Sequence, residues 1–370
     1  MSCPRIEVDL HKIRHNTRTI IERLQGRGIQ VTGVSKAVRG HPAIAQAMLD
    51  GGAAGLAEAR LSNVQRLRTA GMTCPITLIR TPMLSQVDHV VQMCETSYNT
   101  EPTVMAALAA AAIRHGTVHG IILMVEMGDK REGIIPHDLV IIAQQVMDMP
   151  GVALKGIGAN FGCLSGIAPT AVQMRALSDL GTDVEGQCGP YLQTVSGGNS
   201  TSLPWAFGQA TVGRINDLRI GEAILLGVDP ITGAQIDGLF QDAFTLVAEV
   251  VETDRKPLSP SARRAMAGLR LVPKGDGSRR IILAIGDQDT NAAGLTMPPE
   301  NTLIGATSDH LVIRTQDATL RVGAEMRFEM NYAALMRAMA APDIQIVQHH
   351  DTPAPNSRDA QGSRAEWALV

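Results

Sequence analysis

Short apolar runs alternate along much of the chain with longer stretches whose apolar residues recur at the helical period. Residues 5–10 (RIEVDL) alternate as a strand does, and Ile13, Thr17, Ile20 and Leu24 then share one helical face. The further strand-like runs are 28–35, 53–57, 74–80, 120–128, 152–160, 191–199 and 218–227. The further helical stretches are 42–51, 58–71, 84–93, 100–116, 136–149 and 168–181.

Repeated strand–helix units with apolar strands predict a parallel sheet covered by helices. About eight such units fit before residue 235, which favours an α/β fold with a closed (β/α)8 TIM-type barrel. Because periodicity does not reveal closure, an open doubly wound sheet remains an alternative. We expect residues 1–235 to form the barrel.

The pattern changes after Gly233, where strand-like segments follow one another with short turns and little helical period. These segments are 244–253, 279–287, 310–323 and 325–332. We therefore expect a β-rich C-terminal domain over residues 236–345, with loops at 255–268 and 272–280. The composition of residues 346–370 predicts a flexible tail, although the terminal EWALV could dock on the folded part.

The composition narrows the possible partners and the compartment. A net charge of -3 gives no reason to expect nucleic acid or an anionic membrane as a partner. The cysteines (3, 74, 94, 163 and 188) form no CxxC pair, which predicts reduced thiols and no zinc site. No apolar leader opens the chain, and the run VMAALAAAAI is too short to span a bilayer. The sequence predicts a cytoplasmic protein without a metal.

Polar residues gather where the predicted strands end. In a barrel, functional groups come from the loops at the carboxyl ends of the strands. Lys36, Arg131 and Asn160 each follow an apolar run, residues 199–201 (Asn-Ser-Thr) follow another, and Arg219 precedes IGEAILLG. Several such positions on one rim predict a shared site, although each alone is weak evidence, because a lone lysine at a strand end is more often structural or solvated.

The glycine-rich SGGNST run could supply backbone N–H groups and hydroxyls to an oxyanion, as a phosphate cradle requires. A tight turn without a ligand is the alternative, and no Walker lysine follows the run. A lysine, a phosphate cradle and a barrel together indicate a Schiff base to a phosphorylated aldehyde, which is pyridoxal phosphate chemistry.

With these motifs in order, the chain resembles the alanine racemase-like, fold-type III pyridoxal phosphate enzymes, and most of all the ornithine racemase branch. The resemblance covers roughly residues 4 to 342. It rests on IEVDL-HKIRHN, GVSKAVRGHP, EMGDKREG, LKGIGANFGCLSG, SGGNSTSL, INDLRIGEAILLG and GATSDHLVI.

The resemblance implies a role for each matching residue. Lys36 would carry the cofactor and act as one racemisation base, and Arg219 would face its pyridine nitrogen. Arg131 would bind the substrate carboxylate, Asn160 would pack on the cofactor ring, and Asp309 would lie near the active site across a head-to-tail homodimer. The remaining cofactor contacts, mostly to the phosphate, would come from Asn199, Ser200, Thr201, Gly221, Glu222 and Tyr332.

The chain departs from alanine racemases at three positions. Gly40 replaces a tyrosine four residues after the lysine, and Met124 replaces a lysine that many of them carbamylate. Their second catalytic base is a tyrosine, whereas the matching stretch here is GDQDT, with Asp287 at the tyrosine's place and Asp289 beside it.

Two interpretations of these aspartates stay open. Asp287, or alternatively Asp289, could be the second base, in which case burial must raise its pKa. Either could instead bind the side-chain ammonium of ornithine or lysine. His310, beside Asp309, is more often a structural histidine than a base.

The resemblance predicts a pyridoxal phosphate-dependent racemase of a free amino acid, ornithine or another basic one. Alanine or broad-specificity racemisation is one alternative, and a non-catalytic pyridoxal phosphate carrier is another. Carriers resemble the barrel alone, so the β-rich domain argues against a carrier.

Overall fold

The computed structural model describes residues 4–189, 191–254 and 279–349. Eight parallel strands close into a barrel in the order β2 to β9, which confirms the predicted (β/α)8 architecture. The barrel strands are β2 (Gln30–Val34), β3 (Gly55–Glu58), β4 (Ile76–Leu78), β5 (Thr96–Asn99), β6 (His119–Val125), β7 (Val152–Ala159), β8 (Thr194–Ser196) and β9 (Asp217–Ile220).

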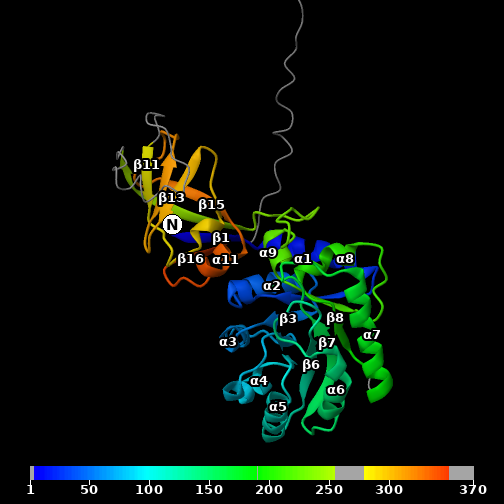
Figure 1. Ribbon diagram of the computed structural model, residues 1–370. Coiled ribbons are helices and arrows are strands. Elements are labelled where there is room, and N and C mark those ends of the chain that lie inside the picture. The colour runs from blue at the N-terminus through cyan, green and yellow to red at the C-terminus, as the bar shows by residue number, and fades with distance from the viewer. Residues whose placement is uncertain (1–3, 190, 255–278, 350–370) are drawn as a thin grey trace, which may run out of the picture.

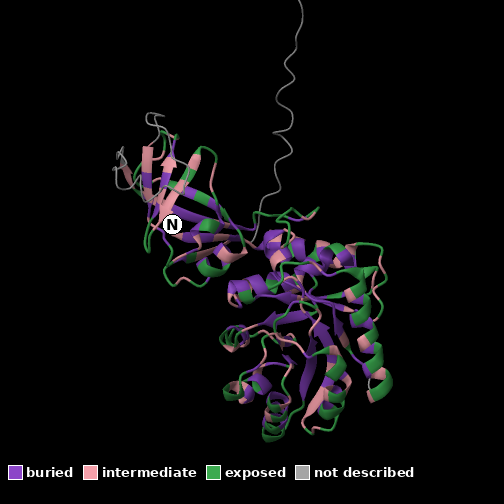
Figure 2. Ribbon diagram, in the orientation of Figure 1, coloured by how far each residue is buried: buried purple, intermediate pink, exposed green. Residues whose placement is uncertain are grey.

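Helices surround the barrel, and the longer ones bury one face and expose the other (Figures 1 and 2). They are α1 (Leu10–Gln25), α2 (Pro42–Asp50), α3 (Leu61–Thr69), α4 (Val87–Met93), α5 (Pro102–Arg114), α6 (Leu139–Met147), α7 (Ala171–Cys188), α8 (Leu203–Phe207) and α9 (Glu222–Leu226). Strand β6 is buried along its whole length, as expected of a parallel strand covered on both faces. None of the helices in the described ranges is long and apolar enough to cross a membrane.

A second, largely antiparallel sheet lies beside the barrel (Figure 1). It contains β1 (Arg5–Asp9), β10 (Phe244–Asp254), β11 (Arg279–Leu283), β12 (Leu295–Thr296), β13 (Asn301–Ala306), β14 (Leu311–Thr315), β15 (Glu325–Met330) and β16 (Gln345–His349). Helix α11 (Tyr332–Ala338) follows β15 and lies against the loop after β2, so this domain reaches the barrel at the end that carries Lys36.

The structure differs from the expected domain division at both ends of the chain. Strand β1 pairs with β10 and β16, so residues 5–9 belong to the second sheet although they precede the barrel in sequence. Residues 345–349 form β16 and extend this sheet into the expected tail. The expected loop 255–268, residues 272–278 of the second expected loop and the rest of the tail, 350–370 with EWALV, lie outside the described residues, whereas residues 279 and 280 of that loop begin β11.

Two local expectations were wrong. Strand β5 was not expected, because its residues TSYN carry no apolar run. The run 218–227 was expected to be one strand, but it divides into β9 and helix α9 at Gly221.

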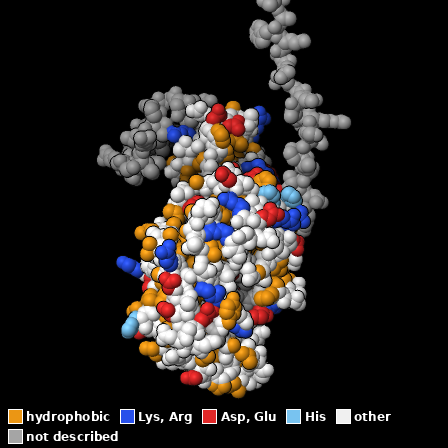
Figure 3. Space-filling view, turned by 90° about the vertical axis from the view of Figure 1, so that its right-hand side faces the viewer, with side chains coloured by type: hydrophobic (Ala, Val, Ile, Leu, Met, Phe, Trp, Pro, Cys, Tyr) orange, Lys and Arg blue, Asp and Glu red, His pale blue; other side chains and the backbone are white. Residues whose placement is uncertain are grey.

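On the face shown in Figure 3, acidic, basic and hydrophobic side chains are interspersed. Cys74, Cys94, Cys163 and Cys188 are free thiols, and Cys3 lies outside the described residues.

Candidate active site

Lys36 lies at the carboxyl end of the barrel, where β2 passes into the short 3-10 turn η1 (Lys36–Val38). The turn closes through Gly40, whose φ of +59° is left-handed and whose added Cβ would lie 2.9 Å from the backbone oxygen of Asn63. Both constraints exclude a large side chain, which accounts for glycine where alanine racemases carry a tyrosine.

Lys36 is an exposed residue at the barrel mouth. Protein atoms nevertheless surround its amine closely enough to reduce the hydration of the amine. Burial therefore lowers the pKa of Lys36, and the charges of Arg131 and Arg219 lower it further, while Cys163 and Glu58 act in the opposite direction. These interactions place Arg131, Arg219, Cys163 and Glu58 around one amine. A lowered pKa increases the neutral fraction of the amine, which is its nucleophilic and basic form.

Glu58, at the end of β3, is a site residue that sequence reasoning missed. It is fully buried and accepts hydrogen bonds from the hydroxyl of Ser35 at 2.6 Å, Nδ2 of Asn63 at 3.0 Å and the backbone N–H of Ala59 at 3.2 Å. Burial raises its pKa, against the effect of these hydrogen bonds. Because Ser35 precedes Lys36, this carboxylate fixes the backbone from which the lysine projects.

Arg219 lies inside the barrel on β9 and is only 4% exposed. Its Nη2 donates to the carbonyl of Ala159 at 2.5 Å and to Oδ1 of Asn160 at 3.0 Å. The guanidinium also lies 4.4 Å from the ring centroid of Tyr98. Its Nη1 is buried without an acceptor among the described residues, so the arginine keeps a donor for a ligand acceptor.

Residues 199–201 form a compact turn after β8. The side chain of Asn199 accepts from the backbone N–H of Thr201 at 2.9 Å, and the Thr201 hydroxyl donates to the carbonyl of Phe161 at 3.0 Å. Ser200 Oγ accepts from the backbone N–H of Ala223 at 3.2 Å, which ties this turn to α9 and leaves the hydroxyl proton to donate. The structure thus brings Asn199, Ser200 and Thr201 next to the start of α9.

Gly221 and Glu222 begin helix α9 at the same end of the barrel. A Cβ on Gly221 would lie 3.0 Å from both Cβ and the backbone oxygen of Val34, so the close approach to β2 requires glycine. Burial raises the pKa of Glu222 to about 7, with Lys36 acting to lower it. Burial also raises the pKa of Tyr332, and the charges of Glu222, Cys163 and Glu58 raise it further. The phenol from α11 therefore lies near the barrel mouth.

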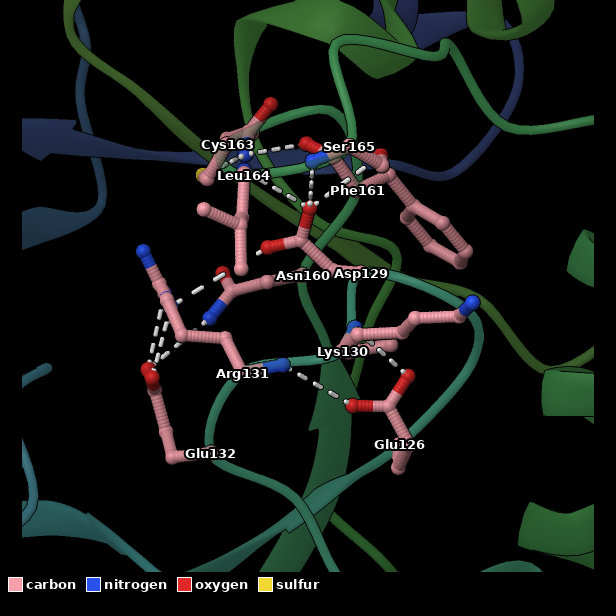
Figure 4. Close-up of polar contacts among 12 residues, drawn as sticks. Glu126, Asp129, Lys130, Arg131, Glu132, Asn160, Phe161, Cys163, Leu164 and Ser165 are labelled. Carbon is pink, nitrogen blue, oxygen red and sulfur yellow. Dashed lines mark hydrogen bonds and ion pairs between the residues drawn. The ribbon is translucent and has the colours of Figure 1, made fainter.

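Arg131, Glu132 and Asn160 form a connected polar chain at the same end of the barrel as Lys36 (Figure 4). Nη2 of Arg131 donates to Oε1 of Glu132 at 2.7 Å, and Asn160 donates from Nδ2 to the same oxygen at 3.3 Å. Since Asn160 also accepts from Arg219, hydrogen bonds link both arginines through Asn160 and Glu132. Met124, at the position of the carbamylated lysine, is buried with Tyr98 and Ile122 in a small apolar cluster.

The aspartates of the second domain lie apart from Lys36 in the single chain. Asp287 and Asp309 are exposed and neighbour each other through Gln288, whose Nε2 donates to Oδ1 of Asp309 at 3.4 Å. Asp289 Oδ2 accepts from the backbone N–H of Gly286 at 2.9 Å, so this carboxylate stabilises its own turn. None of these three charges is among those that shift the pKa of Lys36. His310 is exposed on the same turn.

Within residues 4–189, 191–254 and 279–349, no three His, Cys, Asp or Glu side chains are grouped closely enough to hold a metal ion.

Comparisons with known proteins agree with this geometry. The family model described as alanine racemase, N-terminal domain, matches residues 8–229. A lysine racemase of Thermotoga maritima is 34% identical over 94% of this chain and 99% of its own length. An ornithine racemase of Acetoanaerobium sticklandii is 31% identical over 92% of this chain and 98% of its own length.

Two solved structures share the fold at low identity. The alanine racemase from D-cycloserine-producing Streptomyces lavendulae superposes with a TM-score of 0.76 at 20% identity, covering 95% of this chain and 99% of that chain. D-threonine aldolase from Filomicrobium marinum superposes with a TM-score of 0.74 at 14% identity, covering 94% of this chain and 91% of that chain. The same two-domain architecture therefore carries more than one reaction.

Proposed function

The chain belongs to the alanine racemase family of pyridoxal phosphate-dependent amino-acid racemases, and we propose that its substrate is ornithine or another basic amino acid. The relatives at 34% and 31% identity over nearly the whole chain, named for lysine and ornithine, support a basic substrate. Within the molecule, the observation that supports cofactor-dependent racemisation is that Lys36, an amine of lowered pKa, lies near Arg219, whose Nη1 is buried without an acceptor among the described residues.

Family membership implies pyridoxal phosphate, and the residues present fit it. Lys36 would hold the aldehyde carbon, and Nη1 of Arg219 has no other acceptor among the described residues, as a partner of the pyridine nitrogen requires. Ser200 and the backbone at Gly221 would hold the phosphate, with Asn199 and Thr201 shaping the turn and Tyr332 and Glu222 beside it. When bound, the cofactor supplies an electron-withdrawing ring that acidifies the substrate Cα–H bond.

The chain's own groups would then divide the work. Lys36 would remove or return the Cα proton on one face, and its lowered pKa favours the neutral amine needed for removal. Arg131 would hold the substrate carboxylate. Arg219 does not release its proton, so it would leave the pyridine nitrogen unprotonated, which favours proton exchange over transamination.

The second proton would come from the opposite face, and we propose that Asp287 of a partner chain supplies it in a head-to-tail homodimer, with Asp289 as the alternative and Asp309 nearby. This proposal is supported by the exposure of Asp287 in the single chain and by its absence from the charges that shift the pKa of Lys36. Binding of the substrate ammonium remains the other role for these aspartates.

The first experiment is loss of optical rotation by the cofactor-loaded protein with each L-amino acid in turn. Ornithine or lysine responding above all others is the expected result, and alanine or serine responding instead would contradict the basic substrate. Absence of racemisation with every amino acid would contradict racemase activity in this chain.

A mixing experiment tests the second base. Lys36→Ala and Asp287→Asn are each expected to be inactive, and mixed dimers of the two should regain one intact site, if Lys36 and Asp287 meet across the dimer. No regain of activity, in dimers shown to have exchanged subunits, would contradict the partner-supplied base.

A further inference from the structure

Arg131 lies between two carboxylates that it engages unequally (Figure 4). Glu132 takes the Nε/Nη2 edge of the guanidinium, with Nε 2.6 Å from Oε2 and Nη2 2.7 Å from Oε1. Asp129 Oδ2 lies 4.0 Å from the same Nε, beyond hydrogen-bond distance. A substrate carboxylate that reaches Arg131 in this arrangement must share Nη2 with Glu132.

Asp129 is a buried carboxylate with one oxygen satisfied and one unsatisfied. It is 3% exposed, and its Oδ1 accepts from the backbone N–H groups of Leu164 at 3.0 Å and Ser165 at 3.2 Å. The Ser165 hydroxyl lies 3.3 Å from the same oxygen. These three donors fix the orientation of the carboxylate, so Oδ2 is held toward the Arg131 side. No described donor reaches Oδ2 within hydrogen-bond distance.

A buried carboxylate oxygen without a hydrogen bond raises the free energy of the folded state. Arg131 is the nearby cation that could donate to this oxygen. A shift of Nε by about 1 Å would bring it into hydrogen-bond range of Oδ2. Glu132, by contrast, is only partly buried and also accepts from Asn160, so it loses less when Arg131 leaves.

We propose that Asp129 is a positioning residue for Arg131 in the substrate-bound state. On this inference, which rests on the proposed function, the incoming carboxylate displaces Glu132 from the guanidinium. Arg131 Nε then donates to Oδ2 of Asp129, and the Nη1/Nη2 edge faces the substrate in a bidentate pair. Glu132 competes with the substrate, whereas Asp129 supports its binding.

The two carboxylates should therefore affect substrate affinity in opposite directions. Equilibrium dissociation constants of L-ornithine and of 1,4-diaminobutane, which lacks the carboxylate, are measured by calorimetry on the cofactor-loaded protein. Asp129→Asn keeps an oxygen for Leu164 and Ser165 and should weaken ornithine about tenfold. Glu132→Gln should tighten ornithine about threefold, and neither variant should move diaminobutane more than about twofold.

Asp138→Asn is the matched control, because this exposed aspartate follows the same strand and its side chain makes no contact with Arg131. Melting temperatures check that each variant is folded. A purely structural role of Asp129 would weaken both ligands together, and that result would overturn the inference. A Glu132→Gln variant that binds ornithine more weakly than wild type would also overturn the inference. This second result tests the inference even if Asp129→Asn does not fold.

The measurement also separates this inference from the proposed function. A wild-type protein that racemises no amino acid contradicts the proposed function, whereas the opposite affinity changes need no turnover. A wild-type protein that racemises ornithine but shows equal affinities in both variants overturns the positioning role alone. Failure of the wild-type protein to bind ornithine overturns the inference as well.

Discussion

Replacement of Glu222 by glutamine should stabilise the cofactor-free protein at alkaline pH and leave it unchanged at acidic pH. Glu222 is the first residue of α9, and burial raises its pKa from 4.5 to about 7, with Asp229 also raising it and Lys36 lowering it. The neutral carboxyl is therefore favoured in the folded state relative to the unfolded chain. Glutamine copies that neutral form at every pH.

The sign and size of the effect follow from proton linkage. Between pH 4.5 and about 7 the folded state binds more protons than the unfolded state, so the contribution of Glu222 to stability falls as the pH rises. It is fully present below about pH 4.5 and lost above about pH 7. At about 1.36 kcal/mol per pKa unit the upper bound is about 3.4 kcal/mol. Because the side chain is only partly buried, we expect about 1.5 kcal/mol.

Urea unfolding of wild type and Glu222→Gln at a series of pH values from about 5 to 8.5 measures this difference. The difference between the two free energies of unfolding should grow as the pH rises and reach about 1.5 kcal/mol by pH 8. Glu22→Gln, at an exposed position of α1, is the control and should show no such divergence. A Glu222→Gln difference that is constant across the pH range would refute the reasoning.

Three further predictions test the cofactor contacts. Lys36→Ala should abolish the visible absorbance of lysine-bound cofactor, and an unchanged band would count against this attachment. Arg219→Glu should increase formation of keto acid relative to racemisation, so a variant that racemises cleanly would contradict the pyridine-nitrogen role. Gly221→Ala should weaken pyridoxal phosphate binding about tenfold, because the new Cβ would lie 3.0 Å from Val34 and one side must move. Gly26→Ala, where an added Cβ meets nothing within 4 Å, should not change this affinity.

The barrel was predictable because most of its strands are continuous apolar runs, a consequence of burial on both faces. Strand β5 was not predicted because buried residues in it are polar: Nδ2 of Asn99 donates to Oγ of Ser97 at 3.0 Å. Helix α9 was not predicted as a helix because its residues EAILL are largely apolar, and such a short apolar run fits a strand as well as a buried helix. Only Gly227, left-handed at φ +66°, marks its end.

The sheet to which β1 belongs could not be predicted from the local sequence. Its residues alternate as a strand does, but the partners β10 and β16 lie more than two hundred residues away in sequence. This pairing is set by the tertiary arrangement of the second sheet, so the alternation of apolar and polar residues within β1 does not reveal it. The domain boundary drawn at residue 235 therefore missed a strand from the other end of the chain.

In the site, motif resemblance pointed to residues that gather around Lys36 and missed buried carboxylates beside them. Lys36, Arg219 and Asn160 belong to recognisable motifs, and the structure brings them together. Glu58 stands in an ordinary polar stretch, and Asp129 stands beside Arg131 in EMGDKREG; the burial of both depends on donors from other segments. A buried carboxylate cannot be told from a solvated one until those donors are in place.

The surroundings of Lys36 also bear on the second base. Several carboxylates lie near the barrel mouth. Glu58 accepts hydrogen bonds from Ser35 and Asn63, and Glu132 pairs with Arg131. Oδ1 of Asp129 accepts from Leu164 and Ser165, and Glu222, on which the charge of Lys36 acts, lies beside Tyr332 at the expected phosphate end. Asp287, whose side chain is exposed, fits a base that meets its substrate only on assembly. Two-base racemisation would then depend on the dimer, and dilution of the protein below its dimer dissociation constant should abolish activity while the cofactor stays attached to Lys36.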